Sequence, residues 1–337
     1  MFNRWIDIKS KNFLLLGPRR AGKTTFLRKK YSNFKYVTLD DFDILAFARS
    51  DPKGLIQSLL PNAIIDEIQR APLLTVAIKQ FIDQGSVNVV MTGSSSIGLL
   101  DSSADSLAGR IDILSLPPAC WGEECGEVTH KFFHEQVTPI KIAEAQRQFE
   151  LVLKFGGFPE VVSEPSTENK EIILKRYRDT YFTRDLAQLS NIENVEGLLA
   201  ILQHTSRSIG SHLEISSFAT ESGLSHPTAK KYINTLTQSQ LAFKIYGYHF
   251  GPAKRYLKAA KLYFCDNSLL TALNSQVTRG QAMENFVISE LEKRRKLGFI
   301  KTEQFFYYKS TSGAEIDLMF EVGSDLYAIE IKASRNI

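Results

Sequence analysis

The sequence predicts an α/β protein of several domains, and three observations lead to this expectation. A glycine-rich segment at 17–25 lies between an apolar run and a stretch compatible with a helix. Short helices and an apolar hairpin follow one another at 195–264, and charged residues alternate with apolar ones near 312–334. We expect four modules: a parallel-sheet P-loop NTPase core at 1–140, a helical lid or linker at 141–194, a winged helix at 195–264 and a restriction-endonuclease-like α/β domain at 265–337.

The composition is that of an ordinary globular protein. Hydrophobic residues make up 43% and charged residues 23% of the 337 positions. No apolar stretch approaches the length of a membrane span, and the N-terminus lacks the apolar region of a signal peptide. We therefore expect a cytoplasmic protein. The net charge of +4 is too small to indicate a nucleic-acid partner by itself.

The glycine-rich segment matches the phosphate-binding pattern G-x-x-x-x-G-K-[ST] at every fixed position. Such a loop curls so that backbone N–H groups and the following helix N-terminus face one anion. Lys23 would contact the β- and γ-phosphates, and the Thr24 hydroxyl would bind Mg²⁺. The predicted nucleotide-binding residues are Gly17, Pro18, Arg19, Arg20, Ala21, Gly22, Lys23, Thr24 and Thr25.

A second predicted strand, 63–65, ends in a pair of acids. Asp66 would hold Mg²⁺, through a water molecule, and Glu67 would polarise the water that attacks the γ-phosphate. The alternative is a strand that runs into a solvated acidic turn. The preceding phosphate loop favours the catalytic interpretation.

Two further elements are candidates for sensing or stabilising the γ-phosphate. The strand at 87–91 ends in hydroxyl-bearing residues, and Thr92 and Ser94 are the predicted sensors; a plain strand-to-loop turn is the alternative. Arg110 would contact the γ-phosphate or a neighbouring subunit's nucleotide, since guanidinium matches phosphate oxygens. A structural salt bridge is its alternative. The catalytic candidates are thus Lys23, Glu67 and Arg110.

These motifs resemble those of a known family when they are read in order. They are Gly17 to Thr24, Asp66-Glu67-Ile68-Gln69, Thr92-Gly93-Ser94-Ser95 and Leu107-Ala108-Gly109-Arg110, followed by Gly156-Gly157-Phe158-Pro159-Glu160 and a helix around Arg184-Asp185. The chain resembles, over nearly its whole length, the AAA-type ATPases of bacteria and archaea that carry a C-terminal domain of unknown function. The resemblance implies ATP and Mg²⁺ as cofactors and a DNA-associated C-terminal region.

The middle of the chain predicts a winged helix. A helix at 197–208, a helix that opens at 216, a turn at 222–224 and a helix at 225–240 precede two strands, 241–248 and 261–264. The last of these helices carries the residues that would enter a major groove of double-stranded DNA: Thr228, Lys230, Lys231 and Asn234. Many winged helices instead bind protein or pack between domains, and this alternative stays open.

The C-terminal segment predicts a nuclease-like centre. A hairpin would bring Asp317 beside Glu330 and Lys332 in a D…E-x-K arrangement, and Glu284 would supply a further carboxylate. An inactive or purely binding site, or a plain charged surface hairpin, is the alternative. The chain ends at Ile337, where we expect such a fold to need more covering elements, so an open sheet edge or a partner in a homo-oligomer would complete it.

A cluster of cysteine and histidine is the last candidate site. Cys120, Cys125, His130 and His134 could bind zinc in a tetrahedron, but the two pairs are closer in sequence than in a usual zinc finger. We expect unliganded side chains here. Three cysteines in a chain of this length also argue against a disulfide framework.

Together these features predict a Mg²⁺-dependent ATPase. Its nucleotide state would move the C-terminal modules while the protein is bound to DNA. Two other classes of function remain open at this point. One is an ATP-gated DNA nuclease, and the other is a slow nucleotide switch that assembles protein partners.

Overall fold

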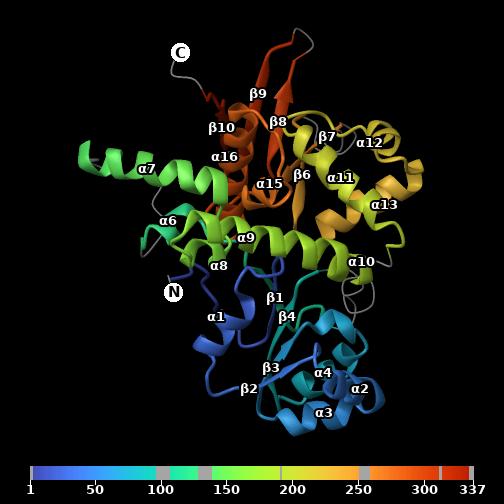
Figure 1. The fold of residues 1–337 in the computed structure, drawn as a ribbon. Helices are drawn as coiled ribbons and strands as arrows, with labels where there is room; N and C mark the ends of the chain where they lie inside the picture. The colour runs from blue at the N-terminus through green and yellow to red at the C-terminus, as the bar shows by residue number, and fades with distance from the viewer. Residues whose placement is uncertain are drawn as a thin grey trace. The chain divides into compact units, whose positions relative to one another are not determined.

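The computed structural model describes residues 3–95, 107–127, 139–189, 192–249, 259–310 and 313–333. The chain divides into two compact units, which we treat separately (Figure 1). The N-terminal unit consists of Ile6–Pro117 with Gln238–Gln240. The C-terminal unit consists of Met1–Trp5, Pro118–Thr237 and Leu241–Ile337. The boundaries predicted at 140, 194 and 264 remain predictions.

The N-terminal unit contains the predicted parallel sheet, in the strand order β2-β3-β4-β1-β5. All four neighbouring pairs are parallel. The strands are short and rich in β-branched and leucine side chains, as expected for strands buried on both faces. Their bounds are Phe13–Leu16 (β1), Lys35–Thr38 (β2), Asn62–Asp66 (β3), Asn88–Gly93 (β4) and Asp112–Ser115 (β5).

Helices cover both faces of this sheet. Leu14, Leu16 and their neighbours on β3 and β4 pack in one core with α3 and α4, whereas Phe13 on the opposite face contacts Tyr31, just after α1. Figure 1 shows α1 on one side of the strands and α2, α3 and α4 on the other. The bounds are Lys23–Lys30 (α1), Phe42–Ser50 (α2), Pro52–Leu59 (α3), Leu74–Asp83 (α4) and a short 3₁₀ turn, Ile68–Arg70 (η1).

The strand register brings three loops together at one edge of the sheet. Leu16 lies opposite Gly93, so β1 and β4 end side by side, and the Gly17 amide donates to the Gly93 carbonyl at 3.3 Å. Thr38 on β2 lies opposite Asp66, the last residue of β3. Because the carboxyl ends of parallel strands meet at one edge, the segments after β1, β3 and β4 form a common site.

The C-terminal unit begins with a largely helical region. One helix, α9, continues without a break into a π-helical segment, η2, which is an uncommon arrangement. The bounds are Trp121–Glu124 (α6), Pro139–Phe155 (α7), Pro159–Ser163 (α8), Thr167–Tyr177 (α9), Arg178–Asp185 (η2), Leu186–Leu189 (α10), Val195–Arg207 (α11), Ile215–Ser222 (α12) and His226–Gln238 (α13).

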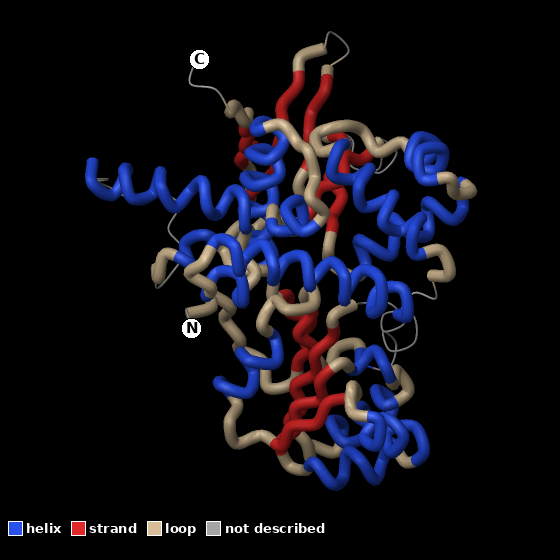
Figure 2. The backbone as a smooth tube through the Cα atoms, viewed as in Figure 1, coloured by secondary structure: helices blue, strands red, loops and turns tan. Residues whose placement is uncertain are grey.

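A second five-stranded sheet, in the order β10-β9-β8-β6-β7, completes this unit. Only the β6–β8 pair is parallel, and in Figure 2 the strands β8 and β9 form a long red hairpin. The bounds are Ala242–Gly247 (β6), Ala260–Phe264 (β7), Phe306–Lys309 (β8), Glu315–Val322 (β9) and Asp325–Ile329 (β10), with helices Ser268–Ala272 (α15) and Arg279–Lys296 (α16) between β7 and β8.

The predicted order of helix, helix, helix and hairpin is therefore present as α11, α12, α13, β6 and β7. The hairpin does not stand alone, however, because β6 also pairs with β8 and so belongs to the same sheet as the C-terminal strands. A large core of buried residues runs from Phe155 to Phe320 through these elements. The winged helix and the nuclease-like fold stay predictions.

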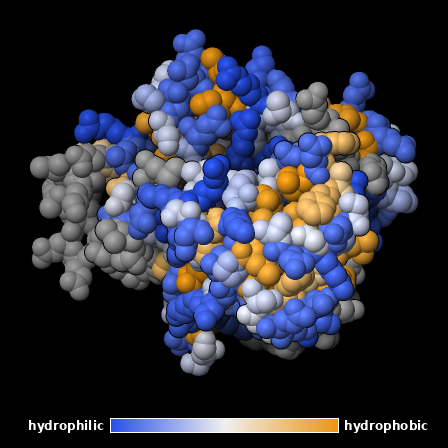
Figure 3. Space-filling model, turned by 90° about the horizontal axis from the view of Figure 1, so that it is seen from below, coloured by the Kyte–Doolittle hydropathy of each residue, from blue (hydrophilic) through white to orange (hydrophobic). Residues whose placement is uncertain are grey.

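Hydrophobic residues are interspersed with hydrophilic ones on the face drawn in Figure 3. A few large apolar side chains on the N-terminal unit are exposed, among them Phe42 and Leu73. Among the described residues, no helix is both long enough and apolar enough to span a membrane.

Candidate functional site

The phosphate loop owes its shape to two glycines. Gly22, the residue before α1, has a φ of 90°, a left-handed conformation that glycine adopts without strain. A Cβ at Gly17 would lie 2.1 Å from the Leu116 carbonyl oxygen, so no other residue fits there. The nine predicted nucleotide-binding residues form the loop after β1 and the first turn of α1. Within it, Arg19 is half-buried and Arg20 is exposed.

Lys23 is buried inside this loop, with 5% of its surface exposed. Its ammonium donates to the carbonyl oxygens of Gly17 at 2.7 Å and Pro18 at 3.1 Å. Burial lowers its pKa below the ordinary value, and the nearby charges of Glu67 and Asp66 oppose this shift. Among the described residues the ammonium forms no ion pair, so its charge is not neutralised within the chain.

Asp66 accepts hydrogen bonds from three different elements. Its Oδ2 atom accepts from the Thr24 hydroxyl at 2.7 Å and from the Tyr36 hydroxyl at 2.8 Å, and its Oδ1 atom accepts from the Thr92 hydroxyl. Burial, followed by the hydrogen bond to Asp66, raises the pKa of Tyr36. Carboxylate and hydroxyl oxygens are the ligands that Mg²⁺ prefers, so this donor set fits the ion.

Tyr36 is a residue of the site that the sequence reasoning missed. It lies within β2, a short strand whose sequence contains no recognisable motif. Only the pairing of β2 with β3 places it beside Asp66, and no local signal in the sequence would have found it.

Glu67 is held by a second set of hydrogen bonds. Its backbone has a φ of 59°, which is unusual for a residue other than glycine, and its N–H donates to the Thr92 hydroxyl at 3.3 Å. The Ser94 hydroxyl donates to Glu67 Oε2 at 3.0 Å. The Gln69 amide donates to the same carboxylate and, at 3.1 Å, to the Ser94 hydroxyl.

Gln69 is the other residue for which sequence reasoning predicted no role. Its side chain is buried, and its Oε1 atom has no hydrogen-bond partner in the structure. Thr92 and Ser94, the predicted sensors, thus lie beside the two acids, and each is hydrogen-bonded to one of them.

Arg110 is not close to this cluster. It precedes β5, which starts opposite Phe13, whereas the phosphate loop follows the end of β1; four residues of strand, about 13 Å, separate the two edges. Its guanidinium forms a two-bond ion pair with Asp83, at 2.6 and 3.1 Å. The geometry therefore does not support a role for Arg110 at the nucleotide of its own chain. A role at a neighbouring subunit's nucleotide remains a prediction.

The nuclease-like centre is only partly assembled in the C-terminal unit. Glu284 on α16 accepts a hydrogen bond from Tyr263 at 2.7 Å, and burial raises its pKa, with smaller contributions from the charges of Asp317 and Glu315. Asp317 instead accepts from the backbone N–H of Ile331 at 2.7 Å. Glu284 and Asp317 therefore interact electrostatically, because the charge of Asp317 contributes to the raised pKa of Glu284.

The other two predicted members of that centre lie on the surface. Glu330 and Lys332 form an ion pair with each other at 3.1 Å, and more than half of each side chain is exposed. A buried lysine, Lys261, pairs with Glu315 next to the acids. Across the described parts of the chain, no group of three or more His, Cys, Asp or Glu side chains could hold a metal ion.

The cysteine and histidine cluster, for which we expect unliganded side chains, can be examined only at its cysteines. Cys120 is buried, and Cys125 lies 3.2 Å from the Gln148 side-chain oxygen. Burial raises the pKa of both thiols, that of Cys125 to about 11, which disfavours the thiolate that zinc requires. His130 and His134 lie outside the described residues.

Helix α13 carries the residues predicted to contact DNA. Lys230 and Lys231 are exposed on it. Asn234 accepts a hydrogen bond from Lys244 on β6 at 3.2 Å, and Thr228 contacts the Ser225 hydroxyl at 2.8 Å. The two lysines are therefore the better candidates for contact with a phosphate backbone.

Three protein-family models match successive parts of the chain. Residues 9–125 match an AAA domain. Residues 146–280 match a domain of unknown function, DUF8612, and residues 279–337 match another, DUF4143. The phosphate loop, the parallel sheet and the acidic strand end all lie within the first match, which supports an AAA-type P-loop ATPase domain in the N-terminal unit.

Similar proteins are known in archaea and bacteria. An uncharacterized protein of Methanocaldococcus jannaschii is 27% identical over 339 residues, which cover 95% of this chain and 75% of that protein. An uncharacterized protein of Mycobacterium tuberculosis is 26% identical, over 95% of this chain and 69% of its own. A solved Walker-type ATPase of Pyrococcus abyssi shares 14% identity and covers 79% of this chain and 91% of its own, with a TM-score of 0.47.

Proposed function

We propose that the N-terminal unit binds ATP with Mg²⁺ and hydrolyses it. The observation that carries this proposal is the arrangement at the carboxyl edge of the parallel sheet. There, the Lys23 ammonium, which forms no ion pair among the described residues, lies near the acids Asp66 and Glu67. The match of residues 9–125 to an AAA domain supports ATP as the nucleotide.

Binding would use the loop and the helix that follows it. The backbone N–H groups of the loop and the N-terminal end of α1 attract anions, and the Lys23 ammonium would exchange its two carbonyl contacts for phosphate oxygens. Thr24 and Asp66 would hold Mg²⁺, directly or through water. The ion, when bound, neutralises phosphate charge and orients the triphosphate.

Hydrolysis would depend on Glu67. Its carboxylate would orient a water molecule toward the γ-phosphate and accept its proton. Ser94 and Gln69 both donate to this carboxylate, and Thr92 binds both Asp66 and the Glu67 backbone. We propose that these residues fix the direction of the two acids and so link the γ-phosphate position to the catalytic carboxylate.

Calorimetric titration with ATP and Mg²⁺ tests the proposal. We expect Lys23→Ala to weaken ATP binding by about 100-fold or more and to abolish turnover, because a buried charge-assisted contact is lost. Lys29→Ala, on the exposed side of the same helix, is the matched control and should behave as the wild type. Unchanged ATP affinity and turnover in Lys23→Ala would overturn the assignment.

We further propose that the C-terminal unit contacts double-stranded DNA through α13. The exposed lysines Lys230 and Lys231, on the helix that follows the α12 turn, support this proposal. An electrophoretic shift with duplex DNA should weaken in the variant Lys230→Ala/Lys231→Ala and not in Lys301→Ala, an exposed lysine elsewhere in the unit. Equal shifts in both variants would contradict it.

Cleavage of DNA has less support than contact with it. Two of the four predicted nuclease residues pair with each other at the surface, and the described residues contain no group of three or more His, Cys, Asp or Glu side chains that could hold a metal ion. An assay of plasmid nicking with Mg²⁺, with Asp317→Ala as the control, would detect such an activity.

A further inference from the structure

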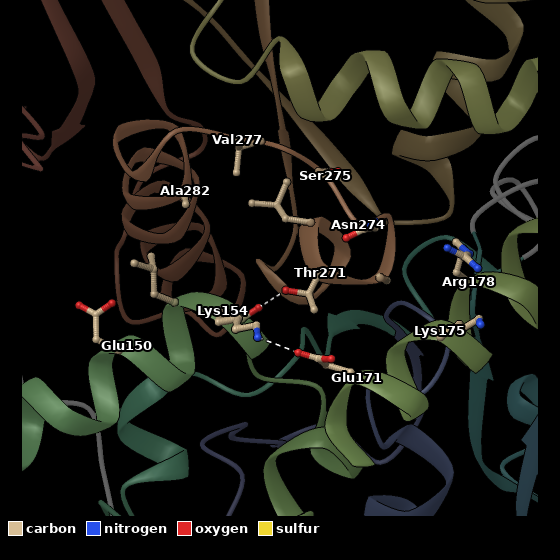
Figure 4. A pocket seen from close by; sticks show the side chains of 13 residues that line it. Glu150, Lys154, Glu171, Lys175, Arg178, Thr271, Asn274, Ser275, Val277 and Ala282 are labelled. Atoms are coloured by element: carbon tan, nitrogen blue, oxygen red, sulfur yellow. Dashed lines mark hydrogen bonds and ion pairs between the residues drawn. The ribbon is translucent and has the colours of Figure 1, made fainter. Parts of the chain in front are cut away.

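The C-terminal unit contains a pocket of about 680 Å³ that no motif of the sequence predicts. Its walls come from the end of α7, from α9 and the start of η2, from α15 and its following turn, and from the first turn of α16 (Figure 4). A volume between about 300 and 1,000 Å³ is typical of sites for small molecules. The pocket is therefore large enough for a metabolite-sized ligand.

The walls of the pocket are held in place by hydrogen bonds between separate elements. The buried Asn267 side chain donates to the Leu153 carbonyl on α7 and to the Ala282 carbonyl on α16, each at 2.9 Å. The Thr271 hydroxyl on α15 donates to the Lys154 carbonyl, a bond drawn in Figure 4. These contacts join three of the elements, so the pocket is formed before any ligand binds.

One end of the pocket is cationic. Lys175 and Arg178 are three residues apart and lie side by side in Figure 4. Lys175 makes no hydrogen bond or ion pair with the described residues, and Arg178 forms an ion pair with its exposed neighbour Asp179, at 2.7 Å. Arg178 is also the first residue of the π-helical segment, and such segments occur frequently at functional sites.

The two acids that line the pocket do not offset this charge. Glu171 forms an ion pair with Lys154 at 2.7 Å, and Glu150 forms one with Arg279 at 2.5 Å. The carboxylates are therefore already matched by cations other than Lys175 and Arg178. Lys175 has no carboxylate partner among the described residues, and it therefore remains available to an external anion.

The other end of the pocket is mainly apolar. Val277 and Ala282 line it, and Figure 4 shows both well apart from Lys175 and Arg178. Leu153 and Leu270 also line the pocket. The Ser275 hydroxyl also lines the pocket, is shielded from solvent and has no hydrogen-bond partner among the described residues. A ligand that matches both ends has an apolar body, a group that accepts a hydrogen bond and an anionic head.

We infer that this pocket binds a small amphipathic anion, with a phosphate or carboxylate head at Lys175 and Arg178 and an apolar body against Leu153 and Leu270. This site lies wholly within the C-terminal unit and is independent of the proposed ATP hydrolysis. The occupancy of this pocket would depend on the concentration of a metabolite and not on the nucleotide.

Fluorescence titration of the full chain with anilinonaphthalene sulfonate tests the inference, because this probe has an aromatic body and an anionic head. We expect saturable binding at one site and competition by octyl phosphate. Inorganic phosphate and octanol, which carry only the head or only the body, should compete at least about tenfold more weakly, a difference of about 1.4 kcal/mol. Equal competition by either of them, or no saturable binding, would overturn the inference.

Substitutions locate the probe. Lys175→Gln/Arg178→Gln should raise the dissociation constant of the probe by about tenfold or more, the loss of roughly 1.4 kcal/mol. Arg176→Gln, an exposed cation on the same helix outside the pocket, is the matched control and should bind as the wild type. Both variants change exposed or half-exposed side chains, so folding should persist and a thermal melt checks it. Equal affinity in the double variant and the wild type would contradict the site.

Discussion

Two buried lysines, one in each unit, are in opposite electrostatic situations. Lys23 in the phosphate loop contacts only carbonyl oxygens of its own loop, and burial lowers its pKa. Lys261 on β7 has 2% of its surface exposed and, like Lys23, lies near carboxylates. Unlike Lys23, it forms an ion pair with one of them, Glu315. It also lies over the Tyr307 ring, 5.0 Å from its centre.

The phosphate loop around Lys23 is thus a site that can bind an external anion. The charge of Lys261, in contrast, is neutralised by a carboxylate of its own chain. Burying a charge without a partner costs free energy, which an arriving phosphate would recover. At Lys261 that compensation already exists in the ion pair with Glu315, and the Lys261 charge also opposes the raised pKa of Glu284. The comparison predicts that substitutions at the first site change catalysis and that substitutions at the second change stability.

The largest effect is expected at Glu67. Glu67→Gln keeps the shape of the side chain and removes the base, so kcat for ATP should fall by about 100-fold or more. The dissociation constant for ATP should change by no more than a few-fold. Steady-state turnover and calorimetry measure the two quantities, with Asp43→Asn, an exposed acid on α2, as the control. A loss of binding that equals the loss of turnover would place Glu67 among the binding residues instead.

A stability effect is expected at Lys261. Lys261→Met leaves the carboxylates of Glu315 and Glu284 without their buried cation, and we expect the free energy of unfolding to fall by about 3 kcal/mol. Lys309→Met, which removes the exposed partner of the same Glu315 at 3.6 Å, should cost much less. Denaturant unfolding measures both. Equal stabilities would mean that the Lys261 pair contributes nothing and would remove the contrast with Lys23.

A smaller effect, with a pH dependence, is expected at Glu124. Burial raises the pKa of this carboxyl well above its ordinary value of 4.5, and within the described parts of the chain its Oε1 atom has no hydrogen-bond partner. The folded state therefore favours the protonated form, so its contribution to stability is fully present below that ordinary value and is lost as the pH rises.

Glu124→Gln removes this dependence, because an amide does not ionise. We expect the variant to exceed the wild type in unfolding free energy by about 1–2 kcal/mol near pH 8 and by little near pH 4. Thermal melts across that pH range measure the difference, and Glu303→Gln, an exposed glutamate, is the control. A difference that does not change with pH would show that Glu124 is ionised without cost.

The smallest effect is expected at Arg110. Because its partner Asp83 is exposed and both residues lie at the edge of the sheet opposite the phosphate loop, Arg110→Ala should leave turnover within about twofold of the wild type. Turnover measured over a range of protein concentrations is the test. A loss that grows with concentration would instead indicate an arginine that acts on a neighbouring subunit.

The sequence was most informative where one short segment determines both the local structure and the chemistry. The loop 17–25 requires its glycines at fixed positions, so its residues specify the shape and the ligand together. The acids at 66 and 67 could be predicted equally well, since they stand where an apolar strand ends. The parallel sheet, which the resemblance and the apolar runs predicted, is confirmed, and it has five strands.

Contacts between distant segments could not be predicted in the same way. Tyr36 reaches Asp66 only through the pairing of β2 with β3, and Lys261 reaches Glu315 across 54 positions of sequence. In the D…E-x-K motif, the alternation predicted which side chains share a face. It did not predict that Glu330 and Lys332 would pair with each other at the surface. Arg110 was a candidate because of its motif, and only the strand register places it away from the loop.

The shared sheet of the C-terminal unit has a practical consequence. Strand β6 hydrogen-bonds to β7 on one side and to β8 on the other, so a fragment that stopped after Phe264 would leave one edge of β6 bare. Bare, apolar edges recruit other chains. Shortened versions of this protein that end there should precipitate, whereas those that retain the strands up to Ile329 should stay dispersed.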